Sequence, residues 1–243
     1  MRTYGPSRRP HLIAATVAAS VSALALATPV ARPAAAQVRV PTAPVALPKK
    51  IEKLSPYLPQ VSCDPVAKPG VVAFARLVRR TYPGTGNSGG IARGCAVAGR
   101  SEHKEGRAWD WAVSAHDRAD AAKASALLTW LLQKDARGKK YGNARRLGIM
   151  YIIWNRRIWG SAHAKDGWRP YTGANPHTDH VHFSFSWAGA MRRTSFWTGK
   201  VAKTDYGPCP PKGGLAPKYN GPNSKRCRDE TGDRDRKRDR KDN

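Results

Sequence analysis

Acidic residues are scarce in this chain of 243 residues. It has 17 Asp and Glu against 43 Lys and Arg, which gives a formal net charge of +26 at pH 7. The excess is not confined to the ends, because residues 63–207 alone carry 24 basic and 10 acidic side chains. A surface so basic attracts anionic polymers, such as acidic wall or lipid-linked polymers or nucleic acid. Basic charge that serves only solubility is the competing interpretation.

Cysteine is also scarce. The four cysteines are Cys63, Cys95, Cys209 and Cys227, and no C-x-x-C pair of the kind that forms thiolate zinc sites is present. Four cysteines allow three disulfide connectivities. We favour Cys63–Cys95, because both residues precede the first polar motif described below and would pin the segment that leads into it. Cys209–Cys227 would then close the start of the tail.

The chain lacks an apolar run of the roughly 20 residues that a membrane span requires. Its main apolar run, Leu12 to Ala27, follows Arg8-Arg9 and precedes small residues suited to cleavage. Residues 1–36 are therefore predicted to be a signal peptide, of either the twin-arginine or the ordinary secretory type. The chain is expected to be secreted and associated with the cell wall. An uncleaved membrane anchor is the alternative.

Internal repeats of a solenoid type are absent as well, so one compact domain is expected. Residues 37–60 are predicted to be a Pro/Ala-rich linker, and residues 61–208 the folded domain. Residues 209–243 are predicted to be a charged, mostly disordered tail, because both signs of charge dominate it.

Apolar periodicity predicts two helices and three strands in the domain. The second helix is expected to be capped by Asp117 and stopped by Gly138. The predicted segments are helices over 70–80 and 118–137 and strands over 108–113, 149–154 and 180–187. This order indicates an α+β fold, a single domain with a mainly antiparallel sheet and flanking helices.

Two polar motifs carry most of the chemical information. The first is S-x-H-x-x-G-x-A-x-D, from Ser101 to Asp110, and the second is H-x-x-H-x-H, from His177 to His182. Because side chains alternate along a strand, His180 and His182 project from one face, about 6–7 Å apart. Imidazole and carboxylate ligands are typical of zinc, and three protein ligands plus one water form a catalytic site.

These motifs resemble the LAS group of zinc metallopeptidases, which includes murein endopeptidases, D-Ala-D-Ala peptidases and the Hedgehog signalling domain. The similarity covers residues 95–187, and the triple histidine spacing looks most like the penicillin-insensitive murein endopeptidases. The whole domain also resembles a family of secreted actinobacterial proteins, most of them without an assigned activity. The resemblance implies a Hedgehog/DD-peptidase-like fold.

The resemblance further implies that His103, Asp110 and His182 bind Zn2+. His180 would act as general base or stabilise the tetrahedral intermediate, with His177 as an auxiliary. The carboxypeptidases of the group use a glutamate as base. Here the nearest carboxylate is Asp179, which strand alternation is expected to point away from the histidine face.

Other residues are candidates for substrate binding. Arg156 and Arg157 are suited to holding a substrate carboxylate, with a solvated turn as the alternative. Trp159, with Trp154 and Trp168, is a candidate for lining a groove, with core packing as the alternative.

The sequence thus predicts a secreted zinc peptidase that hydrolyses peptide bonds in bacterial peptidoglycan, with peptidoglycan peptides and anionic wall polymers as partners. A monomer is expected. One alternative is a non-catalytic zinc-containing domain that binds cell wall or protein. Another is a basic secreted nucleic-acid-binding protein, although no dedicated nucleic-acid motif is present.

Overall fold

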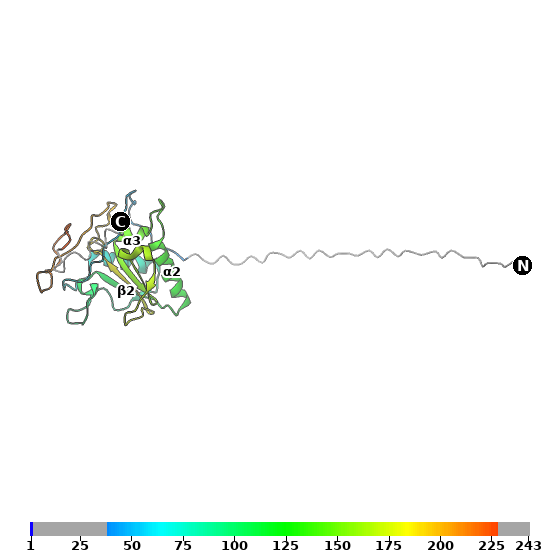
Figure 1. The fold of residues 1–243 in the computed structure, drawn as a ribbon, viewed down its shortest axis with the longest axis horizontal. Coiled ribbons are helices and arrows are strands. Elements are labelled where there is room, and N and C mark those ends of the chain that lie inside the picture. Colours follow the sequence, from blue (N-terminus) through cyan, green and yellow to red (C-terminus); the bar gives the residue numbers. More distant parts are fainter. Residues whose placement is uncertain (2–37, 228–243) are drawn as a thin grey trace. The chain divides into compact units, whose positions relative to one another are not determined.

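The structure, a computed structural model, describes Met1 and residues 38–227 (Figure 1). Six strands form one sheet in the order β1-β2-β6-β3-β4-β5, and every neighbouring pair is antiparallel. Several helices accompany the sheet; in Figure 1, α2 lies to one side of the strands and α3 lies above β2. The predicted α+β class with an antiparallel sheet is therefore confirmed.

The elements follow the predicted order, with short additions between them. The strands are β1 (Gly86–Asn87), β2 (Ala108–Ala112), β3 (Ile149–Trp154), β4 (Arg157–Gly160), β5 (Arg169–Pro170) and β6 (His180–Phe185). The α-helices are α1 (Pro69–Thr81), α2 (Arg118–Leu132), α3 (Gly142–Leu147), α4 (Trp187–Ala190) and α5 (Ser195–Thr198). Two short 3-10 helices are η1 (Glu102–Glu105) and η2 (Ser161–Asp166).

The apolar face of the sheet packs against the helices. Phe74 of α1 makes edge-on ring contacts with Trp109 of β2 and with Phe183 and Phe185 of β6, at centroid distances of 5.9, 5.2 and 5.4 Å. Such aromatic pairs bury large areas and prefer this geometry. The same core includes Leu127 of α2. The helices therefore cover one face, and the polar side chains of β2 and β6 lie on the other.

Strand β6 lies between β2 and β3, so its register with both strands decides which side chains lie next to its histidines. Asp110 lies opposite His182 across the β2–β6 pair, and Ile153 lies opposite the same histidine across the β3–β6 pair. All six residues of β6 are buried, including the histidines of its polar face. The reason is that η1 covers the polar face, where Glu102 and His103 contact Ser184 and His182.

Helix α2 is shorter than predicted. Asp117 caps it as expected, through a hydrogen bond from the backbone N–H of Asp120, but the helix ends at Leu132 and not at Arg137. The chain leaves the helix because Asp135 accepts hydrogen bonds from the backbone N–H groups of Arg137 and Lys139 and pairs with Arg146. A local turn and a tertiary ion pair thus override the continuing helical pattern.

The described part of the predicted linker packs on the domain. Arg146 donates hydrogen bonds to the carbonyl oxygens of Pro48 and Lys50, and Glu52 is buried against the backbone and hydroxyl of Ser195. Residues 38–60 contain no helix or strand but belong to the same compact unit as the domain.

Both disulfides of the favoured connectivity are present, Cys63–Cys95 and Cys209–Cys227. They indicate an oxidising, extracellular environment. None of the described helices has the length and apolarity that crossing a bilayer requires. The predicted signal peptide and the tail beyond residue 227 lie outside the described residues.

Candidate metal centre

The short helix η1 presents His103 to the sheet. Ser101 begins η1 and its hydroxyl accepts a hydrogen bond from the backbone N–H of His103. Gly106 ends η1 in the left-handed region, at φ 62°, and a Cβ there would lie 1.9 Å from the carbonyl oxygen of Val66. Only glycine allows this turn. The chain can therefore pass directly from His103 into β2, which carries Asp110.

His103, Asp110 and His182 form a buried cluster that could hold a metal ion. Asp110 Oδ2 lies 3.2 Å from His103 Nε2, and Asp110 Oδ1 lies 2.8 Å from His182 Nδ1. The two ring nitrogens are 3.3 Å apart, and all three ligand atoms lie within 4.8 Å of one another. One nitrogen of each histidine and one carboxylate oxygen thus converge on a single point.

Hydrogen bonds behind the two rings set which nitrogens face this point. His103 Nδ1 lies 3.0 Å from the carbonyl oxygen of Ile91, which can only accept a hydrogen bond, so the tautomer that donates there has its lone pair on Nε2. His182 Nε2 lies 2.9 Å from Ser184 Oγ. When His182 Nε2 donates to Ser184 Oγ, three acceptors face one another: His103 Nε2, His182 Nδ1 and the Asp110 carboxylate. A positive charge is then required between them. Either a proton on His182 Nδ1 or a metal ion meets this requirement.

A polar chain continues behind His182. The Ser184 hydroxyl donates to Glu102 Oε2 at 3.3 Å, and the Tyr151 hydroxyl donates to the same oxygen at 2.5 Å. Burial, together with the neighbouring Glu102, holds the pKa of Tyr151 well above its ordinary value, so its phenol remains a donor. Such partners orient a metal-binding histidine and raise its basicity. The sequence does not predict this role of Glu102. Its position next to His103 is the one feature that points to it.

His180 lies at the edge of the cluster and is oriented by Asp179. His180 Nδ1 lies 2.8 Å from Asp179 Oδ1, while His180 Nε2 faces Asp110 Oδ1 at 3.7 Å. The prediction that Asp179 points away from the histidine face is wrong. Asp179 precedes β6, so strand alternation does not govern its side chain. A carboxylate on Nδ1 leaves the Nε2 lone pair directed at the cluster.

His177 lies against His180 on the loop before β6. Its ring centroid is 4.7 Å from that of His180 and 5.8 Å from that of His182. Its backbone is left-handed, at φ 52°, and its carbonyl accepts a hydrogen bond from the N–H of Asn155. Burial is the main cause that lowers the pKa of His177 to about 4, so this ring is neutral at pH 7.

The charges within the cluster suit a cation. Burial opposes ionisation of Asp110, but hydrogen bonds to His103 and His182 outweigh it and hold the pKa of this carboxyl well below its usual range. Burial also lowers the pKa of His182. An ionised carboxylate beside neutral imidazoles is the protonation state that metal binding requires.

The remaining predicted site residues are dispersed. Trp159 is only 1 % exposed and packs in the core against Tyr141, so its prediction as a substrate-binding residue is wrong. Arg156 lies in the turn between β3 and β4, Arg157 begins β4, and both are exposed. Among the described residues, no hydrogen bond joins either guanidinium to the cluster. Arg157 donates to the carbonyl oxygen of Trp168 and helps to line a cavity of about 490 Å³.

Arg93 is a basic residue at the cluster that the sequence analysis missed. Its Nη2 lies 3.9 Å from Asp110 Oδ2, and its side chain is 42 % exposed. Its backbone N–H donates to the carbonyl oxygen of His103. Arg93 belongs to no recognisable motif. It reaches Asp110 only because the segment closed by the Cys63–Cys95 disulfide folds against the cluster.

Replacing Glu102 with glutamine should weaken metal binding about 10-fold to 100-fold, the range for loss of a partner that orients a ligand. The glutamine amide keeps the shape of the side chain but removes the negative charge to which the hydroxyls of Ser184 and Tyr151 donate. Affinity would be measured by competition with a chromophoric chelator. The control is Ser125→Ala on the exposed surface of α2, which should leave affinity unchanged. Equal affinity in both variants would mean that Glu102 does not support His182.

Comparison with known proteins gives one similarity. The family described as VldE, C-terminal domain, matches residues 63–182. This range begins at Cys63 and contains His103, Asp110 and His182 together with the neighbouring His177 and His180. No curated protein and no solved structure matches the chain. The family description states no activity, so a function must be argued from the chemistry of the cluster.

Proposed function

We propose that this protein is a secreted zinc-dependent peptidase that hydrolyses peptide bonds in bacterial peptidoglycan. The observation that carries the proposal is the convergence of His103 Nε2, Asp110 and His182 Nδ1, with His180 beside them as a further oriented imidazole. Two histidines and a carboxylate are ligands that favour Zn2+ and leave a fourth position for water or substrate. The motif resemblance to LAS metallopeptidases supports the same class of reaction.

The residues around the cluster are suited to different parts of the reaction. Zn2+ in such a site supplies a Lewis acid that polarises a carbonyl and activates a water. His180 accepts a proton at Nε2, and Asp179 stabilises the resulting imidazolium through Nδ1. His177, neutral at pH 7, donates from Nδ1 to the carbonyl oxygen of Asn175, so its Nε2 lone pair is placed to accept a hydrogen bond from the same side. The half-exposed Arg93 is suited to hold a negative group of the substrate.

The test combines metal analysis with a substrate assay. We expect about one equivalent of zinc in wild type and none in His182→Ala, with peptide fragments released from purified peptidoglycan only by wild type. The matched control is His163→Ala, which removes a histidine of η2 that pairs with Asp166 and not with the cluster. Bound zinc without any released fragment would favour a non-catalytic zinc-containing domain. Absence of metal in wild type would refute the proposal.

Replacing Asp179 with asparagine should lower kcat about 10-fold while zinc content stays at one equivalent. A general base contributes roughly 100-fold to 10,000-fold. The Asp179 side chain is 72 % exposed and acts through His180, not on the substrate, so a smaller effect is expected. Rates and metal content would be compared with those of Asp179→Glu, which keeps the charge and should recover part of kcat. Unchanged kcat in the asparagine variant would remove Asp179 from the mechanism.

A further inference from the structure

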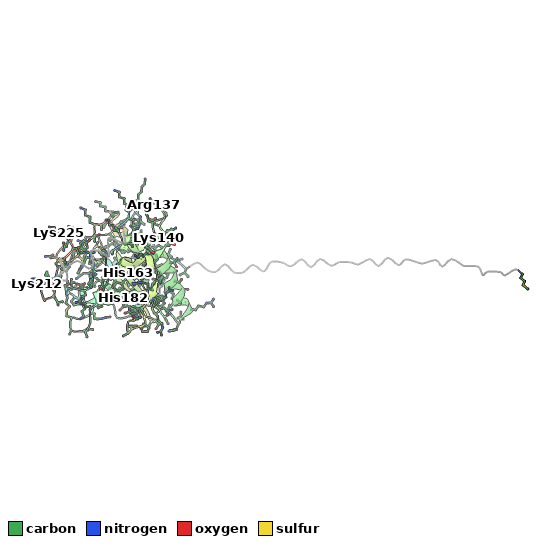
Figure 2. All side chains as sticks on the ribbon, viewed as in Figure 1. Arg137, Lys140, His163, His182, Lys212 and Lys225 are labelled. Atoms are coloured by element: carbon green, nitrogen blue, oxygen red, sulfur yellow. A yellow bond between two sulfur atoms is a disulfide. The ribbon has the colours of Figure 1, made fainter. Side chains whose placement is uncertain are left out.

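A strongly basic groove lies away from the metal cluster. Two cavities, of about 570 and 670 Å³, share Lys53, Arg145 and Thr204 as lining residues, so they form one continuous depression. Neither cavity has any residue of the histidine–aspartate cluster in its lining. In Figure 2, Lys140 of this groove lies above His182 of the cluster. We call this depression the basic groove.

The charge of the basic groove has one sign. Lys50, Lys139 and Lys203 line the larger cavity, in addition to the shared Lys53 and Arg145. Lys140, Lys165 and Arg226 line the smaller one. No aspartate or glutamate lines either cavity.

Acidic residues near the groove are already engaged. Glu52 and Asp205 line a third cavity that shares Lys53, Arg145 and Thr204 with the other two, but both are buried. Glu52 accepts hydrogen bonds from the backbone N–H groups of Ser195 and Ala202, and Asp205 pairs with Arg193. Asp135 and Glu52 act electrostatically on Arg145, so the positive potential of the groove is argued from its lysines Lys50, Lys53, Lys139, Lys140 and Lys203. A concave surface of one sign concentrates ligands of the opposite charge.

The composition of the groove favours a phosphate backbone over nucleic-acid bases. Six of its eight cationic residues are lysines, which act on phosphate as point charges, whereas base edges are typically read by arginine in bidentate geometry. Single-stranded nucleic acid also needs aromatic faces on which bases stack. The two tyrosines here are engaged: the Tyr141 ring packs on Trp159, and the Arg226 guanidinium covers Tyr206.

We propose that the basic groove binds a linear phosphodiester polymer of the bacterial cell wall. The proposal rests on the extracellular environment that the disulfides indicate and on the bacterial wall named in the proposed function, but not on the metal centre. An anchored enzyme would gain a high local concentration of the peptidoglycan to which such polymers are attached. Metal cluster and groove would then serve two components of one wall.

The test uses the purified full chain and poly(glycerol phosphate) as probe. We expect the variant Lys53→Gln/Lys140→Gln/Lys203→Gln to bind the polymer at least about 10-fold more weakly than wild type, with a shallower dependence of affinity on salt. The matched control is Arg76→Gln/Arg79→Gln/Arg80→Gln, which removes the same charge from exposed positions of α1 and should lose less than about 3-fold.

Two results would overturn the proposal. Equal losses in both triple variants would show that polymer affinity comes from the overall charge and not from the groove. Tighter binding of duplex or single-stranded DNA than of poly(glycerol phosphate) at equal phosphate concentration, lost only in the groove variant, would assign the groove to nucleic acid. Zinc content, and peptide release from peptidoglycan freed of phosphodiester polymer, should stay at wild-type levels in the groove variant. Failure of the peptidase assay would therefore not decide whether the groove binds the polymer.

Discussion

Asp110→Asn should abolish the stabilisation of this protein by zinc while leaving the metal-free protein nearly unchanged. Metal affinity should fall more than about 100-fold, because loss of a partner behind a ligand already costs up to that much. At zinc concentrations about 100 times the wild-type dissociation constant, bound metal stabilises the fold by about 2.7 kcal/mol. The variant should lose nearly all of that increment.

The metal-free comparison decides what the cluster is for. With a chelator present, the His182 ring protonated at Nδ1, which lies 2.8 Å from Asp110, can donate to an asparagine oxygen as it does to the carboxylate. Replacing a charged acceptor by a neutral one should therefore change the free energy of unfolding by only about 1 kcal/mol. Both proteins would be unfolded in urea, with and without chelator. The same loss in both conditions would show that the carboxylate serves the fold and not a metal.

Arg107→Ala should destabilise the protein by about 3–5 kcal/mol, the cost of leaving a buried partner without its counter-ion. Arg107 and Glu105 are both fully buried, and Arg107 Nε donates to Glu105 Oε2 at 2.9 Å. Arg107 also donates to the carbonyl oxygens of Phe185 and Leu58, and its guanidinium lies 4.7 Å from the Trp187 ring centroid. Alanine would remove all of these contacts and leave the buried Glu105 carboxylate without a counter-ion.

This ion pair also supports the site. Glu105 Oε1 accepts hydrogen bonds from the backbone N–H groups of Val61 and Ser62, beside the Cys63–Cys95 disulfide, and Glu105 belongs to the same η1 helix as His103. Urea unfolding of Arg107→Ala would be compared with Arg118→Ala, an exposed position at the start of α2 that should change stability by less than about 0.5 kcal/mol.

A second variant separates charge from packing at this position. In Glu105→Gln/Arg107→Met, neither side chain is left as an isolated charge, so the double variant should lose less stability than the sum of the two single variants. If Arg107→Ala unfolds at the same urea concentration as wild type, the pair contributes nothing to the fold. Additive losses in the double variant would instead mean that the two residues act independently.

Local pattern was enough for the elements whose environment is uniform along their length. The apolar, β-branched run over 149–154 is β3 with the same bounds, because a central strand buries both faces. Alternation placed His180 and His182 on one face, and both indeed approach Asp110, at 3.7 and 2.8 Å. Chain order also favoured Cys63–Cys95, since both cysteines precede the segment that carries His103.

Apolar periodicity was enough to predict the α+β class, because it is a short-range property of each helix and strand. The motif resemblance supplied His103, Asp110 and His182 as candidate ligands, and chain order favoured one of three disulfide pairings. The strand order, the early end of α2 and the burial of Trp159 are visible only in the folded structure. In the fold, Glu102, Tyr151 and Arg93 lie at or behind the cluster. The residues of the basic groove come from segments spread between residues 50 and 226. These features depend on contacts between distant segments, whose energies no local periodicity records.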